Sequence, residues 1–115
     1  MSSFEDLEVW KRAVVLSADL YKQLRDLRDY GFKDQLTRAG LSVASNIAEG
    51  MERDSNADKA RHLTIARSSR GEVRTQVYIG LNVGYIDGDI GRRWIKESQE
   101  ISAMLVGLSR SITDG

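Results

Sequence analysis

Few residues of this chain have the types and spacing that catalysis or metal binding requires. His62 is the single histidine among 115 residues, and cysteine is absent. Zinc sites made of cysteines or of several histidines within one chain are therefore excluded. Lys59 stands three residues before His62, so the Glu-x-x-His motif of di-iron bundles is missing. We expect no enzyme, no cofactor and no metal, and we interpret His62 as a partly exposed helix residue.

Two carboxylates and one amide could be buried polar groups of the predicted helices. Glu49 closes an uncharged run that contains Asn46, and Glu72 follows two serines and a glycine in a predicted helix. Because a buried charge is costly without a partner, we interpret each glutamate as paired with an arginine rather than as an acid–base group. An amide in such a helix is expected to be a satisfied packing group. The residues predicted to form a subunit interface or a buried polar network are Arg38, Ser42, Asn46, Glu49 and Glu72.

Three arginines form the candidate binding surface for an anion. Arg67, Arg70 and Arg74 follow the spacing i, i+3 and i+7, which places them on one face of a helix. Such a row can contact successive phosphates of a nucleic acid. The alternative is a solvated face or salt bridges between helices, which the formal net charge of zero favours. Tyr78 and Trp94 could stack on bases, although aromatic residues at helical spacing are typical of a core.

The elements that must position these side chains are predicted to be four helices. Apolar residues recur every three or four positions, proline is absent, and turn residues separate the periodic segments. The first helix is predicted from a capping box at Ser3 to a stop at Gly31, and the second from about Phe32 to about Ala48. The third opens with Ser55 and Asp58 and stops near Gly84. The fourth is capped by Asp87 or Asp89 and carries apolar residues as far as Ile112.

Short connections between these helices predict an all-α, antiparallel up-down-up-down four-helix bundle, with residues 1–115 as one domain. Glycines inside the predicted helices (Gly40, Gly71, Gly80 and Gly107) each cost about 1 kcal/mol relative to alanine. We therefore expect neighbouring backbones to approach closely at these four positions.

One uncharged segment predicts self-association. Ten residues between Arg38 and Glu49 carry no charge, in a chain of which 30% is charged. A helix without a charged face is normally buried on all sides. In a small bundle each helix has one solvent-exposed face. We therefore expect the exposed face of this helix to contact another copy of the chain.

The chain opens without a basic and apolar leader, and no uncharged apolar run approaches the roughly 20 residues that span a bilayer. We expect a cytoplasmic protein with no membrane partner and no small-molecule substrate.

Several motifs follow one another along nearly the whole chain. They are Phe4-x-Asp6-Leu7-x-Val9-Trp10, Gln35-Leu36-x-Arg38-Ala39, Ser42-Val43-x-x-Asn46-Ile47-Ala48-Glu49-Gly50-x-x-Arg53, Leu63-x-Ile65-Ala66-Arg67-Ser68-Ser69-x-x-Glu72-Val73, Gly84-Tyr85-Ile86 and Met104-Leu105-x-x-Leu108. In this order they resemble the four-helix bundle family encoded in intervening sequences of bacterial 23S rRNA genes. Ser68 is a departure, because the family usually has glycine there.

This resemblance implies a four-helix protomer that assembles into a ring-like pentamer, in a family without an established biochemical role. The accessory proteins of diversity-generating retroelements are distantly similar and assist a reverse transcriptase by binding nucleic acid and protein. They are strongly basic, whereas this chain is neutral. We therefore expect a non-enzymatic homo-oligomeric scaffold or adaptor that binds RNA or an RNA-handling protein. The alternative is a protein-interaction module without nucleic-acid affinity.

Overall fold

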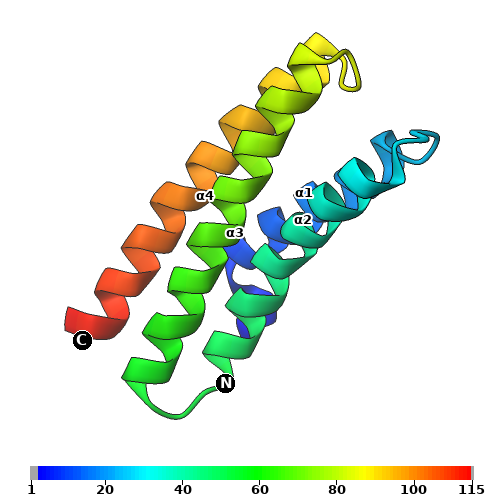
Figure 1. Ribbon diagram of the computed structural model, residues 1–115. Coiled ribbons are helices and arrows are strands. Elements are labelled where there is room, and N and C mark those ends of the chain that lie inside the picture. Colours follow the sequence, from blue (N-terminus) through cyan, green and yellow to red (C-terminus); the bar gives the residue numbers. More distant parts are fainter. Residues whose placement is uncertain (1–2, 115) are drawn as a thin grey trace.

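The computed structural model describes residues 3–114, and within them the secondary structure is entirely helical. A short 3-10 helix, η1 (Phe4–Asp6), precedes four α-helices. These are α1 (Glu8–Gln23), α2 (Tyr30–Met51), α3 (Asn56–Asn82) and α4 (Gly88–Asp114) (Figure 1). The prediction of an all-α fold with four helices is confirmed.

The helices pack side by side into an elongated body of 45 × 21 × 20 Å. α2 contacts α1 and α3, and α4 contacts α3 and α1. Figure 1 shows the α1–α2 and α3–α4 turns at one end of the body, and the α2–α3 turn at the other. We call the first of these the turn end, because two of the connections lie there.

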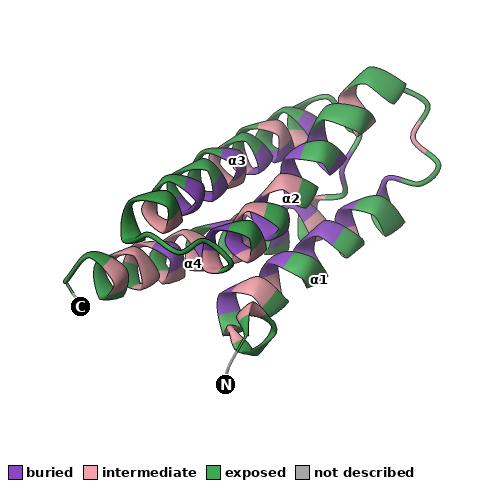
Figure 2. Ribbon diagram, turned by 90° about the horizontal axis from the view of Figure 1, so that it is seen from below, coloured by how far each residue is buried: buried purple, intermediate pink, exposed green. Residues whose placement is uncertain are grey.

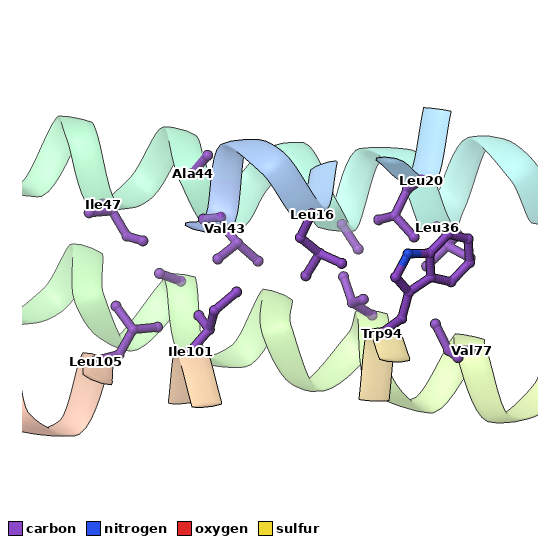
Figure 3. Close-up of a cluster of buried hydrophobic side chains, with 14 of the residues drawn as sticks. Leu16, Leu20, Leu36, Val43, Ala44, Ile47, Val77, Trp94, Ile101 and Leu105 are labelled. Atoms are coloured by element: carbon purple, nitrogen blue, oxygen red, sulfur yellow. The ribbon is translucent and has the colours of Figure 1, made fainter. Parts of the chain in front are cut away.

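The core forms along the middle of the bundle, where each helix turns its apolar residues inward (Figure 2). Figure 3 shows side chains from all four helices meeting there, including Leu16, Leu36, Val77, Trp94 and Ile101. Burying one such side chain contributes about 1.5–3 kcal/mol to folding. The other buried apolar residues are Val9, Ala13, Leu20, Leu24, Ala39, Val43, Ala44, Ile47, Leu63, Ala66, Val73, Ile86 and Leu105.

Three helix ends, the two of α3 and the start of α4, follow the predicted signals. Ser55 Oγ accepts from the Asp58 backbone N–H at the start of α3. Asp87, and not Asp89, caps α4 by accepting from the backbone N–H groups of Asp89 and Ile90. Gly84 follows α3 with a φ of +82°, the left-handed conformation that glycine adopts without strain.

The predicted end of the first helix is wrong. The Ser3 capping box is present, but it opens η1, and α1 ends at Gln23 instead of near Gly31. The reason is Asp29, whose carboxylate accepts from the Phe32 backbone N–H and so begins α2 at Tyr30. Gly31 therefore lies in the first turn of α2. At its other end α2 continues past the predicted Ala48 to Met51.

Two of the four helix glycines mark a close approach. A Cβ atom on Gly40 would lie 2.5 Å from Leu20 Cδ1, and one on Gly80 would overlap Ile86. A Cβ on Gly71 or Gly107 would meet nothing within 4 Å. Close packing within the chain therefore explains Gly40 and Gly80, and the expectation is wrong for the other two.

The uncharged segment of α2 is not buried on all sides within one chain. Val43 and Ile47 are in the core, but Leu41 is 50% exposed and Ser45 is exposed. Ala48 lies one turn further along the same face and is half-buried. The segment thus has an outer face that carries neither charge nor a covering helix of the same chain.

Polar contacts join α1 to α4 beside the core. The Arg12 guanidinium bonds to the carboxylates of Glu97 and Glu100, and both raise the pKa of Arg12. Asp19 accepts from Trp94 Nε1 at 2.7 Å and from Arg93 at 3.0 Å. Burial alone would raise the pKa of Asp19, but these hydrogen bonds outweigh it and lower that pKa.

Candidate nucleic-acid interface

The three candidate arginines lie in the middle of α3, on the flank that faces α4. Ser98 Oγ of α4 donates to the Arg70 backbone carbonyl at 3.3 Å, which fixes this side of α3 against α4. Arg67 is exposed, whereas Arg70 and Arg74 are half-buried. We call Arg67, Arg70 and Arg74 the arginine stripe.

No acidic side chain among residues 3–114 forms an ion pair with the arginine stripe. Three of the four acids of α4 are otherwise engaged, since Glu97 and Glu100 pair with Arg12, and Asp89 pairs with Arg92. Salt bridges between helices, one alternative for these arginines, are therefore not formed in the described part of the chain. The stripe is a local excess of positive charge on a neutral protein.

Arg70 shows the electrostatic consequence of this arrangement. Burial lowers the pKa of Arg70, and the positive charges of Arg74 and Arg67 lower it further. Its Nε atom is buried and, within the described structure, has no hydrogen-bond partner. An anion beside Arg70 would relieve the repulsion among the three guanidinium groups and supply hydrogen-bond acceptors.

The arginine stripe continues into an exposed aromatic residue. Tyr78 lies one helical turn after Arg74, and the Arg74 guanidinium carbon is 5.9 Å from the centre of its ring. Tyr78 is 44% exposed, whereas Trp94, the other aromatic residue considered for base stacking, is 2% exposed. Of the two, only Tyr78 is exposed to solvent.

The residues predicted for a polar network divide between a bonded cluster and an open cleft. Asn46 Nδ2 donates to the Ser42 carbonyl at 2.9 Å and to Ser42 Oγ at 3.0 Å, and Ser69 Oγ donates to Ser42 Oγ at 2.9 Å. This cluster ties α2 to α3. Arg38 and Glu72 are exposed and line a shallow cleft of about 360 Å³ beside it. The other residues of the cleft are Gln35, Ala39, Ser42, Ser69 and Gln76.

Glu49 lies apart from that cluster and near the α2–α3 turn. It is exposed and pairs at 2.8 Å with Arg53, four residues later and just past the end of α2. The expectation that His62 is partly exposed is wrong, because the ring is buried beneath α2. His62 Nδ1 lies 2.9 Å from the Asp58 carbonyl, and His62 Nε2 lies 3.7 Å from Glu49 Oε1.

Gly50 makes room for this histidine, since a Cβ atom there would lie 2.9 Å from His62 Cβ. His62 thus packs α3 against α2 and is closed off from solvent. This surrounding suits a structural side chain better than a proton carrier for a substrate.

Sequence reasoning missed a second uncharged surface, on the outer side of α3. Six residues at helical spacing are exposed or half-buried and carry no charge: Thr64, Ser68, Gly71, Thr75, Ile79 and Asn82. Leu41, Ser45 and Ala48 of α2 form a second uncharged group, separated from that of α3 by the cleft that Arg38 and Glu72 line. We call the two groups together the uncharged face. Their spacing is visible in the sequence, but the arginines and Glu72 between them concealed the pattern.

An apolar cleft of about 460 Å³ between α1 and α4 was also missed. Val14, Val15 and Ala18 line it from α1, and Trp94 lines it from α4. Val15 is 67% exposed, so an apolar surface lies open on this side of the bundle as well.

Residues 3–114 contain neither a metal-binding cluster nor a membrane-spanning helix. No group of three or more histidine, cysteine, aspartate or glutamate side chains is placed to hold a metal ion. No helix in this part of the chain is both long and apolar enough to cross a membrane.

Comparison with known proteins identifies the family. No functionally curated protein is detectably similar to the chain. A crystal structure of a protein of unknown function from the S23 ribosomal protein family of Bacteroides thetaiotaomicron has the same fold, with a TM-score of 0.83 and 23% sequence identity. The match covers 89% of this chain and 98% of that protein. The family model of the 23S rRNA-intervening sequence protein matches residues 5–107, and the chain therefore belongs to this family.

Proposed function

We propose that this protein is a non-enzymatic, cytoplasmic scaffold that associates with itself and binds RNA through the arginine stripe. The observation that carries the proposal is the absence of acidic partners for Arg67, Arg70 and Arg74 within the described residues. Guanidinium groups in such a row are suited to successive phosphates. The family name, which refers to an rRNA intervening sequence, is consistent with an RNA partner.

Binding rather than catalysis is favoured by the position of the titratable groups. His62 is buried, and Glu49 and Glu72 are exposed. Glu72 lines a cleft with Ser42 and Ser69, but these hydroxyls bond to each other and to Asn46, and not to a histidine or carboxylate that could act as a general base.

We also propose that the chain is an up-down-up-down bundle and that it associates with itself. The uncharged face of one copy would contact a second copy. Exposed surfaces of small proteins ordinarily mix charges of both signs, whereas the nine positions of this face carry none. Arg38 and Glu72 lie between its two groups, with opposite charges and without ion-pair partners in the described structure. A contact between copies could pair them.

A closed ring, such as a pentamer, needs two different surfaces on every copy. The uncharged face supplies one surface, and the apolar cleft lined by Val14, Val15 and Ala18 supplies a candidate for the second. We propose that the uncharged face of one copy packs on the α1–α4 side of the next.

RNA binding is tested by replacing all three residues of the stripe with alanine. The affinity for RNA should fall, and the slope of log K against log salt should decrease by about 2, because each phosphate contact to a single strand contributes about 0.7. The matched control replaces Arg28, Arg61 and Arg110, which are exposed and change the net charge equally. Because Arg70 is half-buried, the charge reversal Arg67→Glu at an exposed position provides a second variant that should fold normally.

The second candidate function is a protein-interaction module without nucleic-acid affinity. The apolar cleft between α1 and α4 is the observation that favours it. Wild-type protein that shows no salt-sensitive binding to RNA would support this alternative and contradict the proposed role of the stripe.

A further inference from the structure

The exposed aromatic side chains of this protein are gathered at the turn end. Tyr21, Tyr30, Tyr78 and Tyr85 are all the tyrosines of the chain, and each is at least 40% exposed. They occupy the last turn of α1, the start of α2, the last turns of α3 and the α3–α4 connection. Tryptophan and phenylalanine residues, in contrast, are buried or half-buried.

Only one of these tyrosines adjoins the arginine stripe. Tyr78 follows Arg74 by four residues on the same helix, and the guanidinium lies over its ring. From Arg67 to Tyr78 the helix rises by about 16 Å, so the cations and the ring form one continuous track along α3.

The remaining tyrosines stand in different electrostatic surroundings. Tyr85 donates its hydroxyl proton to Asp29 at 2.9 Å and packs edge-on against Phe32. Tyr30 lies beneath the ammonium of Lys33, 5.0 Å away, in a segment where basic and acidic residues nearly balance. Tyr21 lines a cleft with Lys22, Arg25 and Lys33, but the carboxylate of Asp34 lies among these cations. None of the three rings thus adjoins a row of cations that is free of acidic residues.

We propose that Tyr78 is a base-stacking position at the end of the arginine stripe, and that the ligand is therefore a single-stranded nucleic acid. The inference rests on the proposed function and specifies its ligand. Arginines would hold consecutive phosphates while an unpaired base lies flat on the exposed ring. A duplex keeps its bases stacked inside, so it could use the arginines but not the tyrosine.

Binding of a short oligoadenylate, followed by fluorescence anisotropy, tests the assignment. Tyr78→Ala should weaken binding by about 5- to 150-fold, the range for loss of one base–aromatic stack. The salt slope should stay unchanged because no charge is removed. Tyr78→Phe should bind as the wild type does, since it keeps the ring.

Tyr30→Ala is the matched control, because it removes another exposed tyrosine that lies beneath a cation at the same end of the molecule. Its affinity for oligoadenylate should equal that of the wild type. A duplex of the same sequence should bind wild type and Tyr78→Ala equally.

Equal loss of affinity for the single strand and the duplex in Tyr78→Ala, or no loss for either, would overturn the stacking role. These outcomes are distinguishable from failure of the proposed function. If the proposed function itself fails, protein that retains Tyr78 will not bind oligoadenylate, or its binding will not change when the arginine stripe is replaced.

Discussion

At the scale of single residues, polar side chains at the helix contacts of this bundle have hydrogen-bond partners. Asp19 accepts hydrogen bonds from Trp94 and Arg93, and Ser42 joins Asn46 to Ser69. A buried polar group without such a partner would cost about 1–3 kcal/mol. Two buried side-chain atoms lack a partner within the described residues, Gln76 Oε1 and Arg70 Nε, and the second belongs to the arginine stripe.

Asp19→Asn should destabilise the protein at pH 7 by about 1–3 kcal/mol, because a charge-assisted hydrogen bond becomes a neutral one. The pKa of Asp19 is lowered in the folded state, so its contribution is present above the unfolded value of about 3.9 and is lost as pH falls through the lowered value. Urea unfolding of both proteins as a function of pH measures this. A stability difference that stays constant below pH 4 would contradict the assignment.

Gly50→Ala should destabilise the fold by about 1–3 kcal/mol, because the new methyl group collides with the Cβ of buried His62. Gly71→Ala is the matched control in a neighbouring helix, where the added Cβ meets nothing within 4 Å. There the gain in helix propensity should stabilise by up to about 1 kcal/mol. Chemical denaturation of both variants should therefore show changes of opposite sign.

At the scale of elements, α3 carries three different surfaces along its length. One side supplies Leu63, Val73 and Val77 to the core, the side toward α4 carries the arginine stripe, and the outer side is uncharged. An ordinary surface helix needs only an apolar and a charged side. Because α3 has these three sides, its candidate anion-binding surface and its candidate self-association surface lie next to each other.

The stability of the first turn of α3, the helix that carries the arginine stripe, should depend on its N-cap residue, Ser55. Ser55→Ala should cost about 0.5–2 kcal/mol, since the Asp58 backbone N–H loses its acceptor. Ser55→Asp keeps an acceptor at the same position and should restore stability. Thermal unfolding followed by circular dichroism distinguishes the two variants, and equal melting temperatures would show that the cap is unimportant.

At the scale of the whole molecule, self-association is the prediction with the largest consequences. Leu41→Glu places a charge on the uncharged face, and Val15→Glu places one beside the apolar cleft. Each should lower the mass found by light scattering, because a charge buried at a contact without a partner is costly. Ala103→Glu, at an exposed position of α4, is the control and should leave the mass unchanged.

Mixing the two variants tests whether the contact joins different surfaces. Leu41→Glu protein retains an intact cleft, and Val15→Glu protein retains an intact uncharged face. An equimolar mixture should therefore form heterodimers that cannot extend into rings. Wild-type protein that is monomeric at micromolar concentration would contradict self-association altogether.

The sequence by itself determined the number of helices, the helix caps at Ser55 and Gly84, and the family, because these depend on local spacing and ordered motifs. It also identified the row of arginines, since three residues at i, i+3 and i+7 share a helix face in any fold. It misplaced the end of α1, where the competing cap at Asp29 was stronger than the signal from Gly31.

Only the tertiary structure decided which charges are neutralised. Arg12 of α1 forms ion pairs with both glutamates of α4, so neither glutamate neutralises the arginine stripe. The burial of His62 likewise depends on Gly50 in another helix. Burial and ion pairing depend on neighbours that are distant in sequence, and helical periodicity contains no information about those neighbours.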